Sequence, residues 1–470
     1  MRWTLLPLLM ISLGASPSVA QLAIDWQSSS PAPVAGSAQS GPQATPAAMP
    51  SQTPDNLPAN PPSPGAKPLT VKDAEAIALK NNPVISVARL NALAFHQVTR
   101  EVRSSLWPTA YVDLTGVDAQ ENSRISAGGL NNPIIYERAA AGTTVSQLIT
   151  DFGHTNNLVA SARLHEKAED QNAMATKEQV LLAVDQAFYG ALQSAAVLKV
   201  AEQTVASRQL LSDQVSALTN SKLKSTLDLS FANVNLAQAK LLVLDAQNNS
   251  KAAMANLSAI LGFSTLQDYE LVEDTTPLTQ PPSAVDELIA EAFSQRPEIL
   301  ALEFESQSAQ KFHSAQRDAM LPTISALGAV GEAPVRNDHL SSWYGAVGVN
   351  VQIPVFNGFL LSARSREADL QAQAANQRLI DLRNRVSRDV RTSWLNASTA
   401  YERVSVSQQL LDQANLALSL ADTRYRLGLS SIVELSQAQL QQTQAQIGGV
   451  TATYDYRLAL SILRYQTTGL

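Results

Sequence analysis

The chain has 470 residues, of which 45% are apolar, 16% are charged and 5% are aromatic, so small and aliphatic side chains replace the charges and rings of an average enzyme. It contains no cysteine, which excludes disulfides, thiolate zinc sites, cysteine nucleophiles and lipid attachment to an N-terminal cysteine. Its formal net charge of −7 disfavours binding to a nucleic acid, which needs a concentrated basic face.

Residues 1–20 have the pattern of a secretory signal peptide. Arg2 precedes the apolar run 5–13, and a small-x-small cleavage motif ends at Ala20. Its removal leaves 33 basic residues against 41 acidic ones, a net charge of −8. We find no later apolar run close to the roughly 18 to 20 residues of a membrane-spanning helix, so any membrane span is expected to be β.

Residues 21–68 form a Pro-rich N-terminal segment. Eleven of the 23 prolines lie between residues 28 and 68, with Ser, Ala, Gln and Gly around them. Such a composition cannot bury a core and predicts a disordered tether. A specific role in binding the cell envelope is the alternative.

From residue 69 onward the chain repeats itself. Matching residues recur at a nearly constant offset of 214, then 205, then 206: Pro83 and Pro297, Pro108 and Pro322, Gly153 and Gly358, and Ser225 and Ser431. We therefore predict two structural repeats, 69–262 and 283–470, joined by a linker at 263–282.

Each repeat is expected to contain a helix, two strands, a long helix and a shorter helix. The long helices are predicted to run from Gly153 to about Asn220 and from Gly358 to about Leu427, on the order of 100 Å each. Apolar residues at alternating steps of four and three predict coiled-coil-like packing: Val184, Phe188, Ala191, Ala195 and Leu198 in one, and Leu411, Ala414, Leu418, Ala421 and Tyr425 in the other.

The shorter helices before and after the strands have a combined length close to that of the long helix. We expect them to stack end to end beside it. A seven-residue spacing of apolar residues marks the helices that follow the turns: Leu227, Val234 and Leu241, and Val433, Leu440, Ile447 and Tyr454.

Four strands are predicted, near residues 110–117, 139–149, 324–330 and 343–353. In the last of these, Val347, Val349 and Val351 alternate with polar or small residues and are predicted to face lipid. Aromatic residues stand where a membrane-interface girdle is expected: Trp107, Trp343 and Tyr344. Because four strands leave two open edges, which cannot face lipid, the sheet must close through further copies of the chain.

With this repeat, the chain resembles the outer membrane efflux proteins of Gram-negative bacteria, the TolC-like channel-tunnels. The resemblance rests on the strand starts Trp107-Pro108-Thr109 and Leu321-Pro322-Thr323, the two glycine turns and the run from Tyr425 to Leu435. It implies a mainly α fold with a small β part: long helical hairpins form a periplasmic tunnel, and four strands per chain contribute to a trimeric 12-stranded barrel in the bacterial outer membrane.

The resemblance also implies partners and sites. The hairpin tip would dock a periplasmic adaptor through Gly428, Leu429 and Ser430, with Lys222 and Lys224 in the equivalent turn, and an inner-membrane transporter would supply the energy. Tyr425, Glu434 and Asp228 would belong to the tip gate, although Gln437 stands where relatives carry a second acid.

Each of these tip residues also has a purely structural interpretation. Ser431 and Glu434 have the spacing of a capping box, and Ser225 and Asp228 repeat it. Tyr425 continues the packing seam, and Gly428 suits a left-handed helix end.

We expect a passive exit duct for small molecules, with a type I protein-secretion duct as the alternative. An exported coiled-coil structural protein is a third interpretation, which would not explain the duplicated strands. An enzyme is not expected: the five histidines are scattered, no phosphate-binding glycine motif is present, and we predict no cofactor and no metal site.

Overall fold

The computed structural model describes residues 67–118, 124–127, 130–134, 138–273, 276–333 and 341–467, all within the unit Pro62–Leu470. The predicted signal peptide and the Pro-rich segment up to residue 66 lie outside the described residues. In the described part the two halves run through the same order of elements, with short additions.

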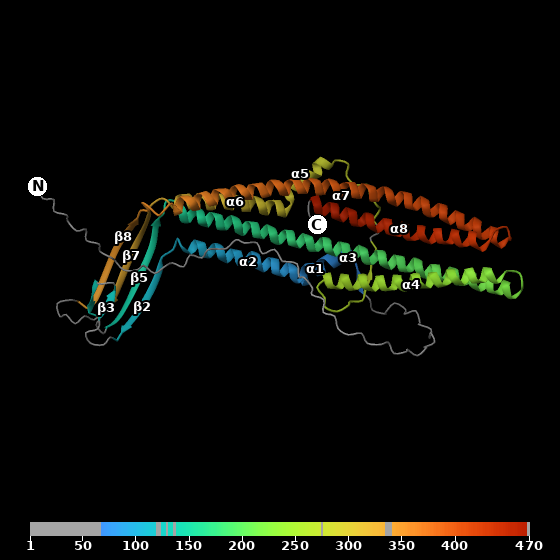
Figure 1. The fold of residues 1–470 in the computed structure, drawn as a ribbon, viewed down its shortest axis with the longest axis horizontal. Helices are drawn as coiled ribbons and strands as arrows, with labels where there is room; N and C mark the ends of the chain where they lie inside the picture. The colour runs from blue at the N-terminus through green and yellow to red at the C-terminus, as the bar shows by residue number, and fades with distance from the viewer. Residues whose placement is uncertain are drawn as a thin grey trace. The chain divides into compact units, whose positions relative to one another are not determined.

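The first half begins with a short strand and two helices, and its long helix follows the strands (Figure 1). Its elements are β1 (Lys67–Leu69), α1 (Val71–Asn81), α2 (Pro83–Ser104), β2 (Thr109–Val117), β3 (Arg124–Ala127), β4 (Leu130–Ile134), β5 (Arg138–Thr150), α3 (His154–Asn220), α4 (Thr226–Ile260) and β6 (Tyr269–Leu271). The second half contains α5 (Val285–Gln295), α6 (Pro297–Asp318), β7 (Thr323–Glu332), β8 (Trp343–Gln352), α7 (Leu360–Arg426) and α8 (Ile432–Thr467).

The predicted long helices are confirmed as α3 and α7, of 67 residues each. Left-handed residues turn the chain from strand to helix at both starts: φ is 55° at Phe152 and 114° at Gly153, and 60° at Gly358 and 65° at Phe359. Proline opens both α2 and α6, where its fixed φ suits a first helical position.

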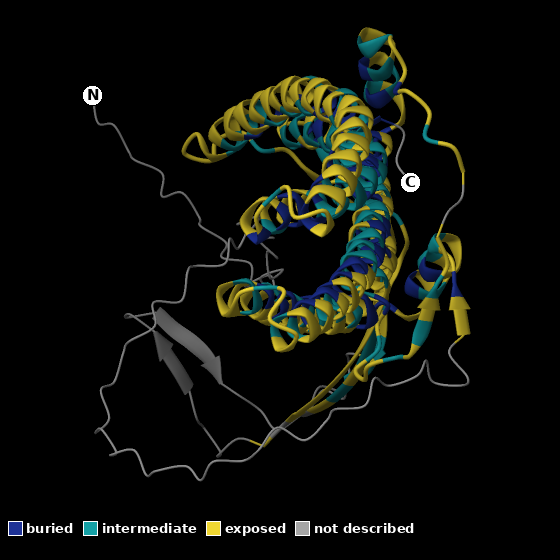
Figure 2. Ribbon diagram, turned by 90° about the vertical axis from the view of Figure 1, so that its right-hand side faces the viewer, coloured by how far each residue is buried: buried dark blue, intermediate teal, exposed yellow. Residues whose placement is uncertain are grey.

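Both shorter helices of each half lie along their long partner, as predicted. Helices α2 and α4 contact α3, and α6 and α8 contact α7. Helix α3 also contacts α6 and α8, which joins the two halves, and the helices follow an open arc in Figure 2.

The packing seams agree with the prediction only in part. Val184, Phe188 and Ala191 are buried on α3, but Ala195 of the same predicted seam is exposed, and the seven-residue row on α4 is not buried within the chain. Leu227, Val234 and Leu241 are 64%, 52% and 62% exposed, because α4 packs through a different face, on which Ala232, Leu236, Ala239 and Leu257 are buried.

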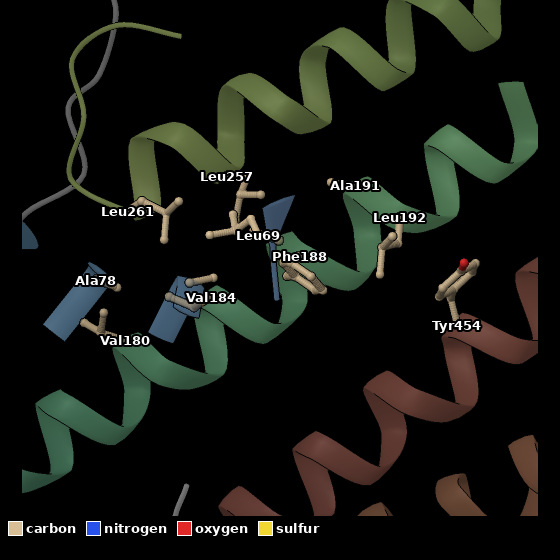
Figure 3. Packing of buried hydrophobic residues seen from close by; sticks show 12 residues of the cluster. Leu69, Ala78, Val180, Val184, Phe188, Ala191, Leu192, Leu257, Leu261 and Tyr454 are labelled. Carbon is tan, nitrogen blue, oxygen red and sulfur yellow. The ribbon is translucent and has the colours of Figure 1, made fainter. Parts of the chain in front are cut away.

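Helix α3 also corrects the expectation that no helix could span a membrane. Among the described residues it is the one helix long and apolar enough to do so by length and composition. Its apolar residues have a different explanation, since Val180, Val184 and Phe188 pack in the largest buried cluster with Leu69 of β1 and Leu257 of α4 (Figure 3).

The described strands form three sheets. The largest is antiparallel in the order β2-β5-β7-β8, so it combines the strand pairs of both halves and confirms the four predicted strands. Strands β1 and β6 pair in parallel, and β3 and β4 form a separate antiparallel pair that the sequence pattern did not predict.

Candidate functional site

Two hairpin turns lie at the end of the long helices remote from the four-stranded sheet (Figure 1). Each long helix ends in a Schellman motif, in which a left-handed residue and its successor donate to carbonyls three and five residues back. The bonds measure 2.9 and 2.8 Å for Lys222 and Leu223, and 3.1 and 2.8 Å for Gly428 and Leu429. The φ angles of Lys222 and Gly428 are 66° and 73°, so these two residues are conformational equivalents.

The helix starts after the two turns differ in their caps. In the first turn the Asp228 amide donates to Ser225 Oγ at 3.1 Å and the Ser225 amide donates to Asp228 Oδ2 at 3.3 Å, a complete capping box. In the second, the Glu434 amide donates to Ser431 Oγ at 3.4 Å, while Glu434 Oε1 lies 3.4 Å from Arg424 Nε. Thus the carboxylate of Glu434 connects α8 to α7.

Tyr425 lies where the two hairpins meet. It is 4% exposed and packs in a cluster drawn from four helices: Leu211 and Val215 of α3, Ala232 of α4, Ala421 of α7, and Ile432, Leu435 and Ala438 of α8. Asn235 of α4 donates to Ser436 Oγ of α8 at 2.7 Å, which adds a polar contact between the hairpins.

The polar surroundings of Tyr425 come from the other hairpin. Lys224 Nζ lies 3.9 Å from the centroid of its ring, a cation–π contact. Burial, and then the nearby charge of Asp228, raise the pKa of the tyrosine. Its hydroxyl is buried and has no hydrogen-bond partner within the part of the chain that the structure describes.

Apolar side chains project from both turns. Leu223, Leu227, Leu427, Leu429 and Val433 are each more than half exposed. The space beside Gly428 is open, and the hydroxyl of Ser430 is buried without a partner among the described residues. Both turns therefore expose leucine side chains, and in the second turn the backbone at Gly428 is not covered by a side chain.

The sequence did not reveal Arg424 as the partner of Glu434, nor Leu223 and Leu427 as exposed tip residues. Arg424 is separated from Glu434 by the whole turn, so no helical spacing relates the two. Leu223 follows the left-handed residue of its Schellman motif, a position whose apolar side chain usually packs back on the helix, so the sequence gives no signal of its exposure.

The strand register separates a mainly apolar face of the sheet, which also carries Thr143 and Gln147, from a mixed face, which also carries Leu148 and Leu327. Val347, Val349 and Val351 share a face with apolar or small residues of the other strands: Ala110, Val112 and Leu114 on β2, Val145 on β5, and Ile324, Ala326 and Val330 on β7. Asn350 and Gln352 lie on the opposite face with Tyr111, Asp113, Thr144, Ser146 and Ser325. Trp107 and Trp343 are exposed at opposite ends of this sheet.

No cluster of three or more His, Asp or Glu residues suited to a metal ion occurs in the described ranges. The features that the tip and the sheet offer are exposed apolar side chains, packed helices and an ion pair.

A family model described as "Outer membrane efflux protein" matches residues 76–263 and 288–467. Among curated proteins, the chain is 22% identical over 403 residues to the outer membrane efflux protein BepC of Brucella suis, covering 83% of each chain. It is 22% identical over 395 residues to the outer membrane protein TolC of Escherichia coli, covering 80% of this chain and 77% of TolC. A probable efflux pump outer membrane protein of Pseudomonas putida, TtgC, is 24% identical over 377 residues, 78% and 76% of the two chains.

Solved structures share the fold. A membrane protein from Pseudomonas aeruginosa aligns with a TM-score of 0.74 at 21% identity, covering 85% of this chain and 93% of that one. The outer membrane channel CmeC of Campylobacter jejuni aligns with a TM-score of 0.74 at 18% identity, covering 85% of each chain.

Proposed function

The chain belongs to the outer membrane efflux protein family, and from this premise we propose that it is the passive exit duct of a tripartite efflux system. The observation that carries the proposal is a four-stranded sheet with one mainly apolar face, joined directly to helices that follow an open arc. A sheet of this kind suits lipid on one side and water on the other.

Closure of the sheet requires a trimer in this proposal. Strands β2 and β8 are the two edges of the sheet, and open edges are not tolerated in lipid. Three copies would provide 12 strands, above the minimum of about eight for a membrane barrel. Trp107 and Trp343, at the two ends of the sheet, are placed to lie at the two membrane interfaces.

The helices support the same assembly, because apolar rows remain exposed on α4 and α7. On α4 the row contains Leu227, Phe231, Val234 and Leu241, and on α7 it contains Val406, Leu410, Leu420 and Leu427. Their spacings, of 4, 3 and 7 residues on α4 and of 4, 10 and 7 on α7, are sums of the alternating steps of four and three that pair helices in coiled coils. In the proposed tunnel, α4 of one protomer would pack against α7 of the next.

The hairpin tip is the proposed docking and closing element. Gly428, Leu429 and Ser430, with Lys222 and Lys224 in the equivalent turn, would receive a periplasmic adaptor that connects the duct to an inner-membrane transporter. The leucines exposed beside these residues provide apolar contact area. Tyr425, Asp228 and Glu434 would hold the resting tip closed through contacts between helices.

Small-molecule efflux is the favoured cargo class, since several similar proteins are named as parts of efflux pumps. A type I protein-secretion duct is the alternative, because the cargo would be selected by the transporter. An exported coiled-coil rod would not explain a four-stranded sheet with a mainly apolar face.

The test compares two neighbouring residues of β8. Arginine at Val349 should cost about 2 to 4 kcal/mol near the bilayer midplane and abolish outer-membrane yield, whereas Asn350→Arg should be tolerated and change the conductance. Light scattering of the detergent-extracted wild type should give a trimer, and planar bilayers should show channels. Equal loss from both variants, a monomer in lipid, or a rod recovered without detergent would contradict the proposal.

A further inference from the structure

One row of residues crosses all four strands of the largest sheet. Asp113 of β2 is paired with Gly142 of β5, Gly142 with Gly331 of β7, and Gly331 with Tyr344 of β8. Because directly paired residues of neighbouring strands share one face of a sheet, all four lie on the mixed face, which also carries Asn350. An acid and an aromatic residue thus stand at the two ends of the row, with two glycines between them.

The two glycines make room for the side chain of Tyr344. A Cβ at Gly331 would lie 2.6 Å from the Tyr344 hydroxyl and 2.7 Å from its ring carbon Cζ, and a Cβ at Gly142 would collide with the same hydroxyl. The phenol end of Tyr344 therefore occupies the space that side chains on β7 and β5 would otherwise fill. Its ring extends from β8 across β7 toward β2 and rests on the backbone of the sheet.

This placement brings the ring close to the carboxylate of Asp113. Neighbouring strands are about 4.8 Å apart, so a hydroxyl that lies over β5 is about one strand spacing from β2. Asp113 is exposed and forms no ion pair with another described residue, and Tyr344 is 44% exposed. Both groups are therefore available to a ligand on the mixed face.

An aromatic ring beside a carboxylate suits an organic cation. The face of the ring carries partial negative charge and attracts alkylammonium groups, and the carboxylate adds a full negative charge. Because one side of the Tyr344 ring rests on the glycine backbone, the ring presents its other side away from the sheet.

We propose that Asp113 and Tyr344 form a binding site for organic cations of the alkylammonium class. Binding itself requires only the row of residues within one sheet. The role of the site rests on the proposed function: in the duct the mixed face lines the lumen, so each protomer would place one such site on the exit path of a cationic cargo.

The test is saturation-transfer NMR of tetraethylammonium with the full-length detergent-extracted protein. Tyr344→Leu should raise the Kd about two- to fivefold, which corresponds to a cation–π contact of about 0.5 to 1 kcal/mol. Asp113→Asn should raise it by a similar factor, because it removes the ionic contact. Tyr344→Phe keeps the ring and should change the Kd by less than about twofold.

The matched control is Glu332→Gln. Glu332 is paired with Trp343, so it lies beside the row but on the opposite face of the sheet, and its replacement should leave the Kd unchanged. The site is overturned if tetraethylammonium shows no saturable binding, if Tyr344→Leu and Asp113→Asn keep the wild-type Kd, or if Glu332→Gln weakens binding as much as Asp113→Asn does.

Planar bilayers test the duct separately from the site. Saturable binding by a protein that forms no channels would contradict the duct and support the site. Channels from a protein without saturable binding would support the duct and overturn the site.

Discussion

The α3–α4 turn and the α7–α8 turn end their long helices with the same pair of backbone hydrogen bonds, but they differ in their side-chain contacts. The first turn uses Lys222 in the left-handed position and completes a capping box through Asp228. The second uses Gly428, and its Glu434 contacts Arg424 of the neighbouring helix. Although the two backbones are alike, the carboxylate of Asp228 caps its own helix, whereas the carboxylate of Glu434 forms an ion pair with the neighbouring helix.

The two turns also differ at the residue three positions before the left-handed one. Thr219 occupies this position in α3, and its hydroxyl donates to the Val215 carbonyl of its own helix at 2.8 Å. Tyr425 occupies it in α7 and fills the space between the hairpins. The aromatic side chain of the second hairpin thus packs the four helices of the tip against one another.

The largest expected effect follows from replacing Tyr425, the residue that makes the two hairpins different. Tyr425→Ala should destabilise the tip by about 3 to 5 kcal/mol, since it leaves a cavity in a cluster formed by four helices. Thr219→Ala should cost less than about 1 kcal/mol because it removes one bond within α3 and one long bond, of 3.4 Å, to the Ser225 carbonyl across the turn. Hydrogen exchange of residues 211–235 measures both, and similar costs at the two positions would show that the hairpins share the cluster equally.

A second prediction concerns tip closure. Tyr425→Phe combined with Glu434→Gln removes the exposed ion pair between Glu434 and Arg424 and a hydroxyl without a partner in the described chain. It should therefore shift the balance from closed to open by about 1 kcal/mol or less and raise the single-channel conductance in planar bilayers. Asp422→Asn is the control, because Asp422 pairs with Arg426 within α7 and bridges no helices. Unchanged conductance in an intact double mutant would leave Glu434 with a role only at its helix start.

The caps provide a third prediction. Ser225→Ala should destabilise the start of α4 by about 1 kcal/mol, the usual contribution of a helix cap. Ser431→Ala should cost about half as much, because at the start of α8 the described contacts include only one bond of the capping box, from the Glu434 amide to Ser431 Oγ at 3.4 Å. The comparison is made by hydrogen exchange of the first turns of α4 and α8, and a larger loss at Ser431 would reverse the assignment of the two carboxylates.

The smallest effect is expected at the left-handed residues. Lys222→Gly should stabilise the first turn by about 0.5 to 1 kcal/mol, because glycine adopts a positive φ without a Cβ penalty. Gly428→Lys should cost a similar amount and no more, since the space beside Gly428 is open. Thermal unfolding of the two variants would test this, and a loss of stability in Lys222→Gly would indicate that the lysine side chain stabilises the turn.

Much of the fold follows from local patterns. Gly153 and Gly358 predicted the starts of α3 and α7 to within two residues, because a left-handed turn must precede these helices. The alternation of valine in 343–352 predicted β8 and the face that its valines share. The contacts at the tip could not be predicted in the same way, since Asp228 and Glu434 occur at matching positions of the two repeats but their carboxylates have different partners.

The sequence by itself determined the long helices, the shorter helices beside them and the four strands of the largest sheet, and that their order occurs twice, because periodicity, prolines and caps act over a few neighbouring residues. Only the tertiary structure decided which apolar rows are buried: Leu227, Val234 and Leu241 have the spacing of a core seam, yet α4 packs through another face, which buries Ala232, Leu236, Ala239 and Leu257.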